Sequence, residues 1–166
     1  MTGRSKHGAL RDRAELAAYL LLRTFFRLLP LRAADAVGRG LGHLFRLLDG
    51  RRRRLAAANL ALAFPEKERA EVDALVRGVF AHFGGLAAEL FRSETEPAEE
   101  LLCRIETVGV ENARAAAASG RGVFFATPHL GNWEWAALAT GALGIPVTIV
   151  ARPLDNPLLD ARLTAM

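Results

Sequence analysis

Residues 120–134 read GRGVFFATPHLGNWE and contain both a strand signal and the start of a helix. Val123 to Thr127 is short, aromatic and β-branched and follows a glycine turn, which is typical of a buried parallel strand. Asn132 is a good helix N-cap, and the residues after it favour helix up to the Gly144-Ile145-Pro146 stop. This stretch therefore predicts a strand, a tight turn and a helix.

The turn carries a histidine and a carboxylate, His129 and Glu134, five positions apart. Residues five apart on one helix point about 140° away from each other, so the pair meets only if His129 precedes the helix. Pro128 and Gly131 favour that arrangement. Glu134 would then orient the imidazole, whose other nitrogen accepts a proton from a substrate hydroxyl. We include Gly131 and Asn132 as substrate-binding residues, because free N–H groups at a helix start favour an anion.

This segment resembles the bacterial lipid A biosynthesis acyltransferases, the late lauroyl and myristoyl transferases, and more remotely the glycerolipid acyltransferases. The resemblance continues through ARPLDNPLLD at residues 151–160 and, upstream, through the arginine run at residues 51–54 and AFPE at residues 63–66. It implies that His129 is the general base and Glu134 its partner. It also implies that Arg152 and Asn156 belong to the substrate pocket or to its structural support.

The resemblance implies transfer of a fatty acyl chain from an acyl carrier protein or coenzyme A thioester to a hydroxyl of a glycolipid, such as a lipid A precursor. The thioester is a co-substrate, and no further cofactor is expected. No metal site is expected either, because His7, His43, His82 and His129 include no HExxH motif and no cysteine pair exists. Family members continue well beyond this point, so we expect the chain to be a truncated, amino-terminal part of such an enzyme.

Charge is distributed unevenly along the chain. Residues 1–54 hold 13 Lys and Arg against 4 Asp and Glu, and residues 55–166 hold 9 against 14, for a net charge of +4. A basic amino-terminal part suits an anionic membrane or a phosphorylated glycolipid. The alternative functions are a non-catalytic basic module that binds membrane or nucleic acid, or an inactive truncated acyltransferase. Nucleic acid is not expected as a partner, because no aromatic residue adjoins the arginine run.

Residues 16–31 form an apolar run that Arg23 and Arg27 interrupt. A bilayer span needs about 20 mostly apolar residues, so the run predicts an amphipathic helix lying in the membrane interface, with a tilted span or an ordinary core helix as alternatives. The predicted location is the cytoplasmic face of the inner membrane, through peripheral binding or a single amino-terminal anchor. The predicted apolar anchors are Leu21, Leu22, Phe25 and Phe26, and the predicted membrane or phosphate contacts are Arg23, Arg27, Arg51, Arg52, Arg53 and Arg54.

The chain divides at the acidic stretch of residues 94–100. Before it, the patterns predict helices over residues 33–48, with a small-residue face at Gly38, Gly40 and Gly42, and over residues 51–64 and 66–91. After it, strands over residues 105–108, 123–127 and 147–150 alternate with helices over residues 111–118 and 132–143. The predicted class is therefore α/β, with a helical membrane-proximal region (1–93) and a truncated acyltransferase core (94–166) that has a mainly parallel sheet.

Overall fold

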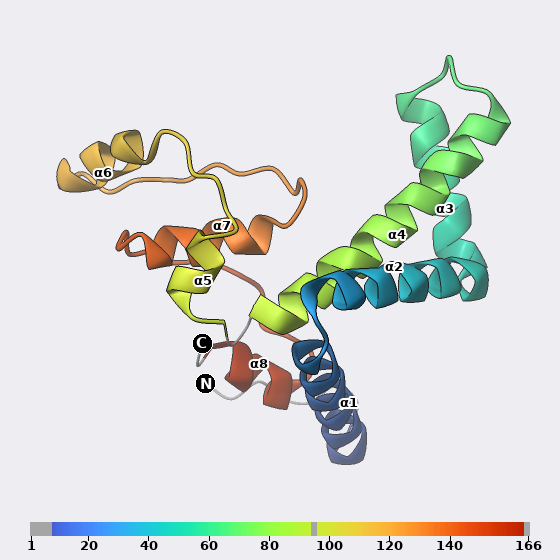
Figure 1. Ribbon diagram of the computed structural model, residues 1–166, viewed down its shortest axis with the longest axis horizontal. Coiled ribbons are helices and arrows are strands. Elements are labelled where there is room, and N and C mark those ends of the chain that lie inside the picture. The colour runs from blue at the N-terminus through green and yellow to red at the C-terminus, as the bar shows by residue number, and fades with distance from the viewer. Residues whose placement is uncertain (1–7, 94–95, 165–166) are drawn as a thin grey trace. The chain divides into compact units, whose positions relative to one another are not determined.

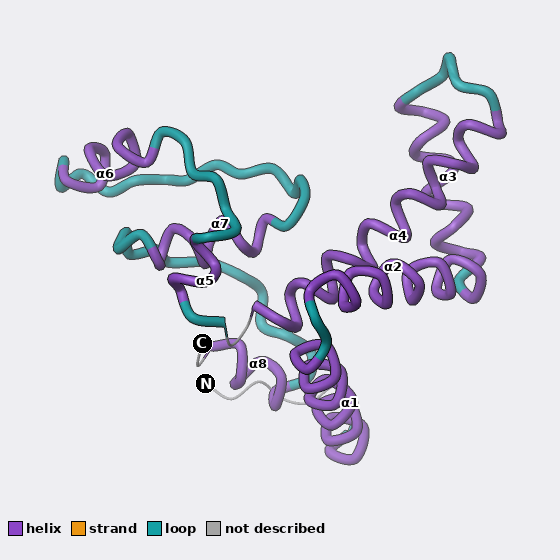
Figure 2. The backbone as a smooth tube through the Cα atoms, in the orientation of Figure 1, coloured by secondary structure: helices purple, strands orange, loops and turns teal. Residues whose placement is uncertain are grey.

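A computed structural model describes residues 8–93 and 96–164, and within these ranges the chain is helical with no strand (Figures 1 and 2). The chain forms two compact units, which are residues 1–21 with 93–166 (unit 1) and residues 22–92 (unit 2). The helices are α1 (Ala9–Leu28), α2 (Leu31–Leu48), α3 (Gly50–Ala63), α4 (Arg69–Ser93), α5 (Ala98–Leu102), α6 (Val110–Ala118), α7 (Trp133–Ala142) and α8 (Pro157–Thr164).

Unit 2 is built from the end of α1, α2, α3 and α4, and it confirms the helices predicted for this part of the chain. Pro30 separates α1 from α2, since proline cannot continue a helix but fits at the start of the next one. Asp49 caps α3, and its carboxylate accepts the backbone N–H of Arg52 at 2.8 Å. Residues 64–68 then join α3 to α4 in a helical hairpin (Figure 1).

Glycines bring α2 and α4 into backbone contact. Gly38 and Gly42 are buried on one face of α2, and a Cβ atom at Gly42 would overlap the carbonyl oxygen of Phe80. A Cβ atom at Gly84 would likewise overlap the carbonyl oxygen of Gly38. Gly40 is exposed, and a Cβ atom there would meet nothing within 4 Å beyond its chain neighbours and the backbone of its own helix. The small-residue face therefore consists of Gly38 and Gly42, because residues four apart share a helix face and residues two apart do not.

Two small apolar cores flank this contact. In the first, Phe26 of α1 packs with Ala34 and Ala88, and its ring stacks on Phe91 with 5.8 Å between centroids. In the second, Val72, Val76 and Phe80 of α4 pack against Ala56, Ala57 and Leu60 of α3. Arg92, at the end of α4, donates to the backbone carbonyl of Phe26 at 3.0 Å and also to that of Leu29. These bonds satisfy carbonyls that the end of α1 would leave unpaired.

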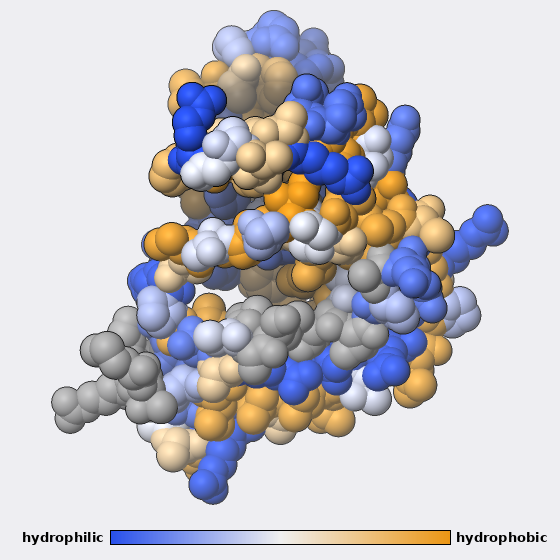
Figure 3. Space-filling view, turned by 90° about the vertical axis from the view of Figure 1, so that its left-hand side faces the viewer, coloured by the Kyte–Doolittle hydropathy of each residue, from blue (hydrophilic) through white to orange (hydrophobic). Residues whose placement is uncertain are grey.

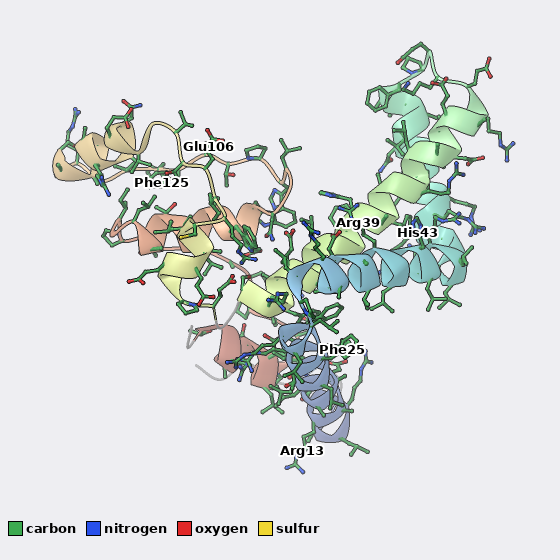
Figure 4. The ribbon with its side chains drawn as sticks, viewed as in Figure 1. Arg13, Phe25, Arg39, His43, Glu106 and Phe125 are labelled. Atoms are coloured by element: carbon green, nitrogen blue, oxygen red, sulfur yellow. The ribbon has the colours of Figure 1, made fainter. Side chains whose placement is uncertain are left out.

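The apolar run of residues 16–31, predicted to lie at the membrane, contains both buried and exposed residues. Phe26 is buried, with 2% of its surface exposed, so its assignment as a membrane anchor is corrected to a core residue. Leu21 and Leu28 of the same helix are 72% and 79% exposed, and Phe25 is exposed on α1 (Figure 4). Among the described helices, α4 is the one with the length and composition to cross a membrane, although it also supplies residues to both cores.

Unit 1 contains the first part of α1 together with α5, α6, α7 and α8. Leu101 of α5, Ala139 of α7 and Ile145 are buried, and α5 packs against α7. The guanidinium of Arg162 on α8 lies 5.8 Å from the ring centroid of Tyr19 on α1. The helices predicted over residues 111–118 and 132–143 are confirmed as α6 and α7. Glu94 and Thr95, which begin the predicted acidic boundary, lie outside the described residues, as does His7.

The predicted α/β class with a mainly parallel sheet is wrong. Residues 105–108, 123–127 and 147–150 form no strand in the described part of the chain. Val150 is 96% exposed, and Phe125, in the loop between α6 and α7 (Figure 4), is 49% exposed. Their β-branched and aromatic side chains favour an extended backbone, but a strand also requires a neighbour to complete its hydrogen bonds. None of these segments pairs with another one.

The glycine contact between α2 and α4 leads to a stability prediction. Gly42→Ala is expected to lower the free energy of unfolding by about 1–3 kcal/mol, because the added methyl group overpacks the contact with Phe80. Urea denaturation followed by circular dichroism measures the change. Gly40→Ala is the matched control, and it is expected to retain or raise stability by up to ~1 kcal/mol, since alanine favours helix. Equal losses in the two variants would contradict the proposed packing.

Candidate active site

His129 lies in the exposed loop that leads into α7. Gly131 has a φ of 58°, in the left-handed region that glycine adopts readily, so it makes the tight turn that the sequence predicts. Glu134 is the second residue of α7 and its first-turn acidic residue. The local arrangement is therefore the one expected from the spacing, with His129 before the helix and Glu134 within its first turn.

Trp133, rather than Glu134, is the neighbour of His129. The imidazole and indole ring centroids are 4.8 Å apart, with the planes tilted by 53°. Glu134 is exposed, and among the described residues no hydrogen bond joins it to His129. Successive residues of a helix are about 100° apart, so Trp133 and Glu134 leave the turn in different directions. The pairing of His129 with Glu134 stays a prediction.

Asn132 stands at the N-cap position of α7, as predicted, but its side chain makes no capping hydrogen bond there. Its backbone carbonyl accepts the N–H of Trp135 at 3.1 Å. A helix begins with N–H groups that lack intrahelical partners, and these favour an anion. Gly131 and Asn132 thus lie where a developing oxyanion or a phosphate would be stabilised, and their binding role stays a prediction.

Trp135 attaches the start of α7 to the rest of unit 1. Its indole N–H donates to the hydroxyl of Ser93 at 3.2 Å, and the guanidinium of Arg104 lies 4.7 Å from its ring centroid. Arg104 also pairs with the carboxylate of Glu96. The sequence pattern places Trp135 within a predicted helix and does not predict this group of contacts. The sequence signal for these contacts is Trp135 itself, an aromatic residue in the first turn of α7, two positions after Trp133.

Arg152 and Asn156, which the family resemblance implied, lie in different environments. Arg152 is exposed and pairs with Asp155 at 2.7 Å. Asn156 is 4% exposed, and its amide nitrogen donates to the carbonyl of Asp12 and the carboxylate of Glu15, both at 3.0 Å. Its amide oxygen accepts the first N–H groups of α8 at 2.9 and 3.3 Å. Both donor hydrogens and both lone pairs of the Asn156 amide are thus used within the protein. This favours a structural role for Asn156 over a role in substrate binding.

The predicted arginine contacts belong to unit 2. Arg51 to Arg54 occupy the first turns of α3, while Arg23 is half-buried and Arg27 exposed on α1. Arg52 pairs with Asp49 at 2.5 Å, and its guanidinium lies 5.6 Å from the ring centroid of Phe45. The pKa of Asp49 is lowered because its carboxylate accepts the backbone N–H of Arg52 and pairs with the guanidinium.

Across the described residues, no three His, Cys, Asp or Glu side chains converge as metal ligands would.

The chain belongs to the bacterial lipid A biosynthesis acyltransferase family, whose sequence model matches residues 1–166. It is 31% identical to a lipid A biosynthesis lauroyltransferase of Escherichia coli over 132 residues, which cover 80% of this chain and 43% of that protein. It is 27% identical to a lipid A biosynthesis acyltransferase of Haemophilus influenzae, with coverage of 86% and 44%. A lipid A biosynthesis myristoyltransferase of Escherichia coli is 26% identical, with coverage of 80% and 41%.

The chain therefore spans less than half the length of these curated relatives. No solved structure matches it.

Asn156→Ala tests whether this buried amide holds α8. Loss of an N-cap costs about 0.5–2 kcal/mol, so the amides of Leu158 and Leu159 are expected to exchange faster with deuterium. Asn156→Asp retains the capping oxygen but faces Glu15, so it should protect these amides and still lower the free energy of unfolding. Asn112→Ala, at an exposed position of α6, is the control. Unchanged exchange in Asn156→Ala would contradict a structural role.

Proposed function

We propose that this protein is an acyltransferase of lipid A biosynthesis type. In this proposal it moves a fatty acyl chain from an acyl carrier protein or coenzyme A thioester to a hydroxyl of a glycolipid, such as a lipid A precursor. The observation that carries the proposal is an exposed imidazole, His129, directly before a helix whose first turn holds a carboxylate, in a chain of this family. Imidazole suits the work because its ordinary pKa lies near neutrality.

His129 acts as the general base in the proposed reaction. It takes the proton from the acceptor hydroxyl, whose oxygen bonds to the thioester carbonyl carbon while the carbon–sulfur bond breaks. The proton then passes from the imidazolium to the leaving thiolate. The turn at Gly131 and Asn132 precedes the N–H groups at the start of α7, which favour the oxyanion formed during the attack. The chemistry needs no metal and no covalent enzyme intermediate.

Glu134 orients the imidazole when substrate is bound. Both side chains are exposed, and exposed side chains change rotamer within picoseconds to nanoseconds, so the proposed pairing involves rotation of these two side chains. Catalytic hydrogen bonds are often long or absent in a free enzyme and form in the complex with substrate. Trp133 limits the orientations open to the imidazole, since its indole already lies beside it.

The proposed location is the cytoplasmic face of the inner membrane. Residues 22–64 hold nine arginines and two aspartates, and large apolar side chains are exposed on the same helices. Hydrophobic and hydrophilic residues lie side by side on the face of the protein drawn in Figure 3. Exposed apolar area beside a basic cluster suits the boundary between acyl chains and anionic headgroups. Arg51 to Arg54 are the proposed headgroup contacts.

Replacement of the proposed base is the direct test of the reaction. His129→Ala is expected to lower acyl transfer by about 10²- to 10⁴-fold, the usual contribution of a general base, with little effect on folding. Transfer is measured in membranes of cells that express the protein from its own gene. His82→Ala, at an exposed position of α4, is the matched control and should retain activity. Turnover near that of the unmodified protein in His129→Ala would reject the assignment.

Glu134→Gln separates orientation of the imidazole from substrate binding. The change keeps the shape of the side chain and removes its charge, so kcat is expected to fall while KM for the acceptor changes little. Glu111→Gln removes the corresponding first-turn acid of α6 and is the control. If KM rises and kcat is unchanged, Glu134 binds the substrate and does not orient His129.

A further inference from the structure

Unit 2 contains an open, apolar cavity of about 640 Å³ that the proposed reaction does not use. One wall is a stripe of α4 with four-residue spacing, formed by Val79, Phe83, Ala87 and Phe91. Among the residues that line the cavity, Arg52 and Asn59 of α3 are the polar side chains. The volume lies within the range of about 300–1,000 Å³ that is usual for small-molecule sites.

The cavity walls remain accessible. Leu41 and Phe45 of α2 and Leu55 of α3 line the cavity and are exposed, as is Phe83 of α4. Apolar side chains that surround one open cavity suit contact with another apolar group. A polar ligand would not remove this apolar surface from water, so the cavity favours a hydrocarbon ligand.

The polar edge of the cavity favours an anion. The guanidinium of Arg52 gives one nitrogen to Asp49, and its remaining donors make no hydrogen bond to the described residues. Arg51, Arg53 and Arg54 precede and follow it in the first turns of α3. A guanidinium has five N–H donors arranged to match phosphate, so pairing with Asp49 leaves donors for a second anion.

We infer that the cavity binds one acyl tail of an anionic membrane phospholipid, with the phosphate held at Arg52. The inference rests on the proposed location at a membrane, and the residues that line this lipid site do not include His129. A helix of another protein is a poorer fit, because a helix is about 10–12 Å across and 640 Å³ would hold only about one turn. A hydrocarbon tail is narrow enough to lie along the stripe on α4.

The test uses the 166-residue chain with vesicles of phosphatidylglycerol that carries a photoactivatable group on one acyl chain. After irradiation, mass spectrometry locates the labelled residues. Label is expected on Val79 to Phe91 of α4 and on Leu41 or Phe45 of α2. Label confined to exposed residues outside the cavity, such as Leu48 and Leu62, would overturn the inference in favour of surface contact alone.

Ala87→Trp fills the cavity from an exposed position on its wall. Labelling within the cavity is expected to fall by about tenfold, equivalent to ~1.4 kcal/mol of binding free energy. Ala74→Trp, at an exposed position of α4 outside the cavity lining, should leave labelling unchanged. Equal labelling of these two variants would overturn the inference. A lipid-independent dimer that Ala87→Trp abolishes would overturn it in favour of a second copy of the chain.

Arg52→Gln provides a second variant, which leaves the apolar side chains of the cavity wall unchanged. It is expected to remove the preference for phosphatidylglycerol over phosphatidylcholine, whereas Arg77→Gln, at an exposed position of α4 outside the cavity lining, should retain it. An unchanged preference in Arg52→Gln would overturn the headgroup assignment.

A soluble short-chain phosphatidylglycerol probe separates the inference from the proposed function. Labelling of the cavity by this probe without vesicle binding would support the cavity and contradict the membrane location. Vesicle binding without cavity labelling would support the membrane location and contradict lipid binding in the cavity. Labelling that persists in His129→Ala, alongside lost acyl transfer, is expected if the two sites are separate.

Discussion

The backbone contact between α2 and α4 is the constraint on which unit 2 depends. Gly38 and Gly42 lie one helical turn apart and meet the backbone of Gly84 and Phe80 at a separation that leaves no space for a side chain. Protein interiors are close-packed, so a methyl group there has to be accommodated by moving a helix. That movement would disturb both neighbouring cores, since Phe80 and Ala88 belong to the same face of α4.

Unit 1 depends more on polar side-chain contacts than unit 2 does. Its buried apolar residues are few among those described, and side chains with polar groups make many of its long-range contacts. Trp135 attaches α7 through Ser93 and Arg104, and Asn156 attaches α8 to the backbone at Asp12. The start of α7 is therefore held in place while the loop before it stays exposed. An accessible imidazole beside a fixed helix start is what the proposed proton transfer requires.

The failure of the predicted sheet shows what a strand pattern does and does not establish. Residues 123–127 and 147–150 have strand composition, and their backbone is neither helical nor paired. Side chains set the preference for an extended backbone, but hydrogen bonds to a neighbouring segment make a strand. A helix closes its own hydrogen bonds within a few residues, so helices were predicted well from local patterns. Sheets depend on residues far apart in the chain.

The sequence by itself determined helices α2, α3, α4, α6 and α7, the turn at Gly131 and the order of His129 before Glu134, because capping, glycine conformations and helix period act within a few residues. Tertiary structure alone decided that Phe26 is buried while Leu21 is exposed, and that Gly42 packs while Gly40 does not. It also placed Trp133 beside His129 and joined Asn156 to Asp12, 144 residues away. Such choices depend on which helix faces meet, and a local pattern does not contain that information.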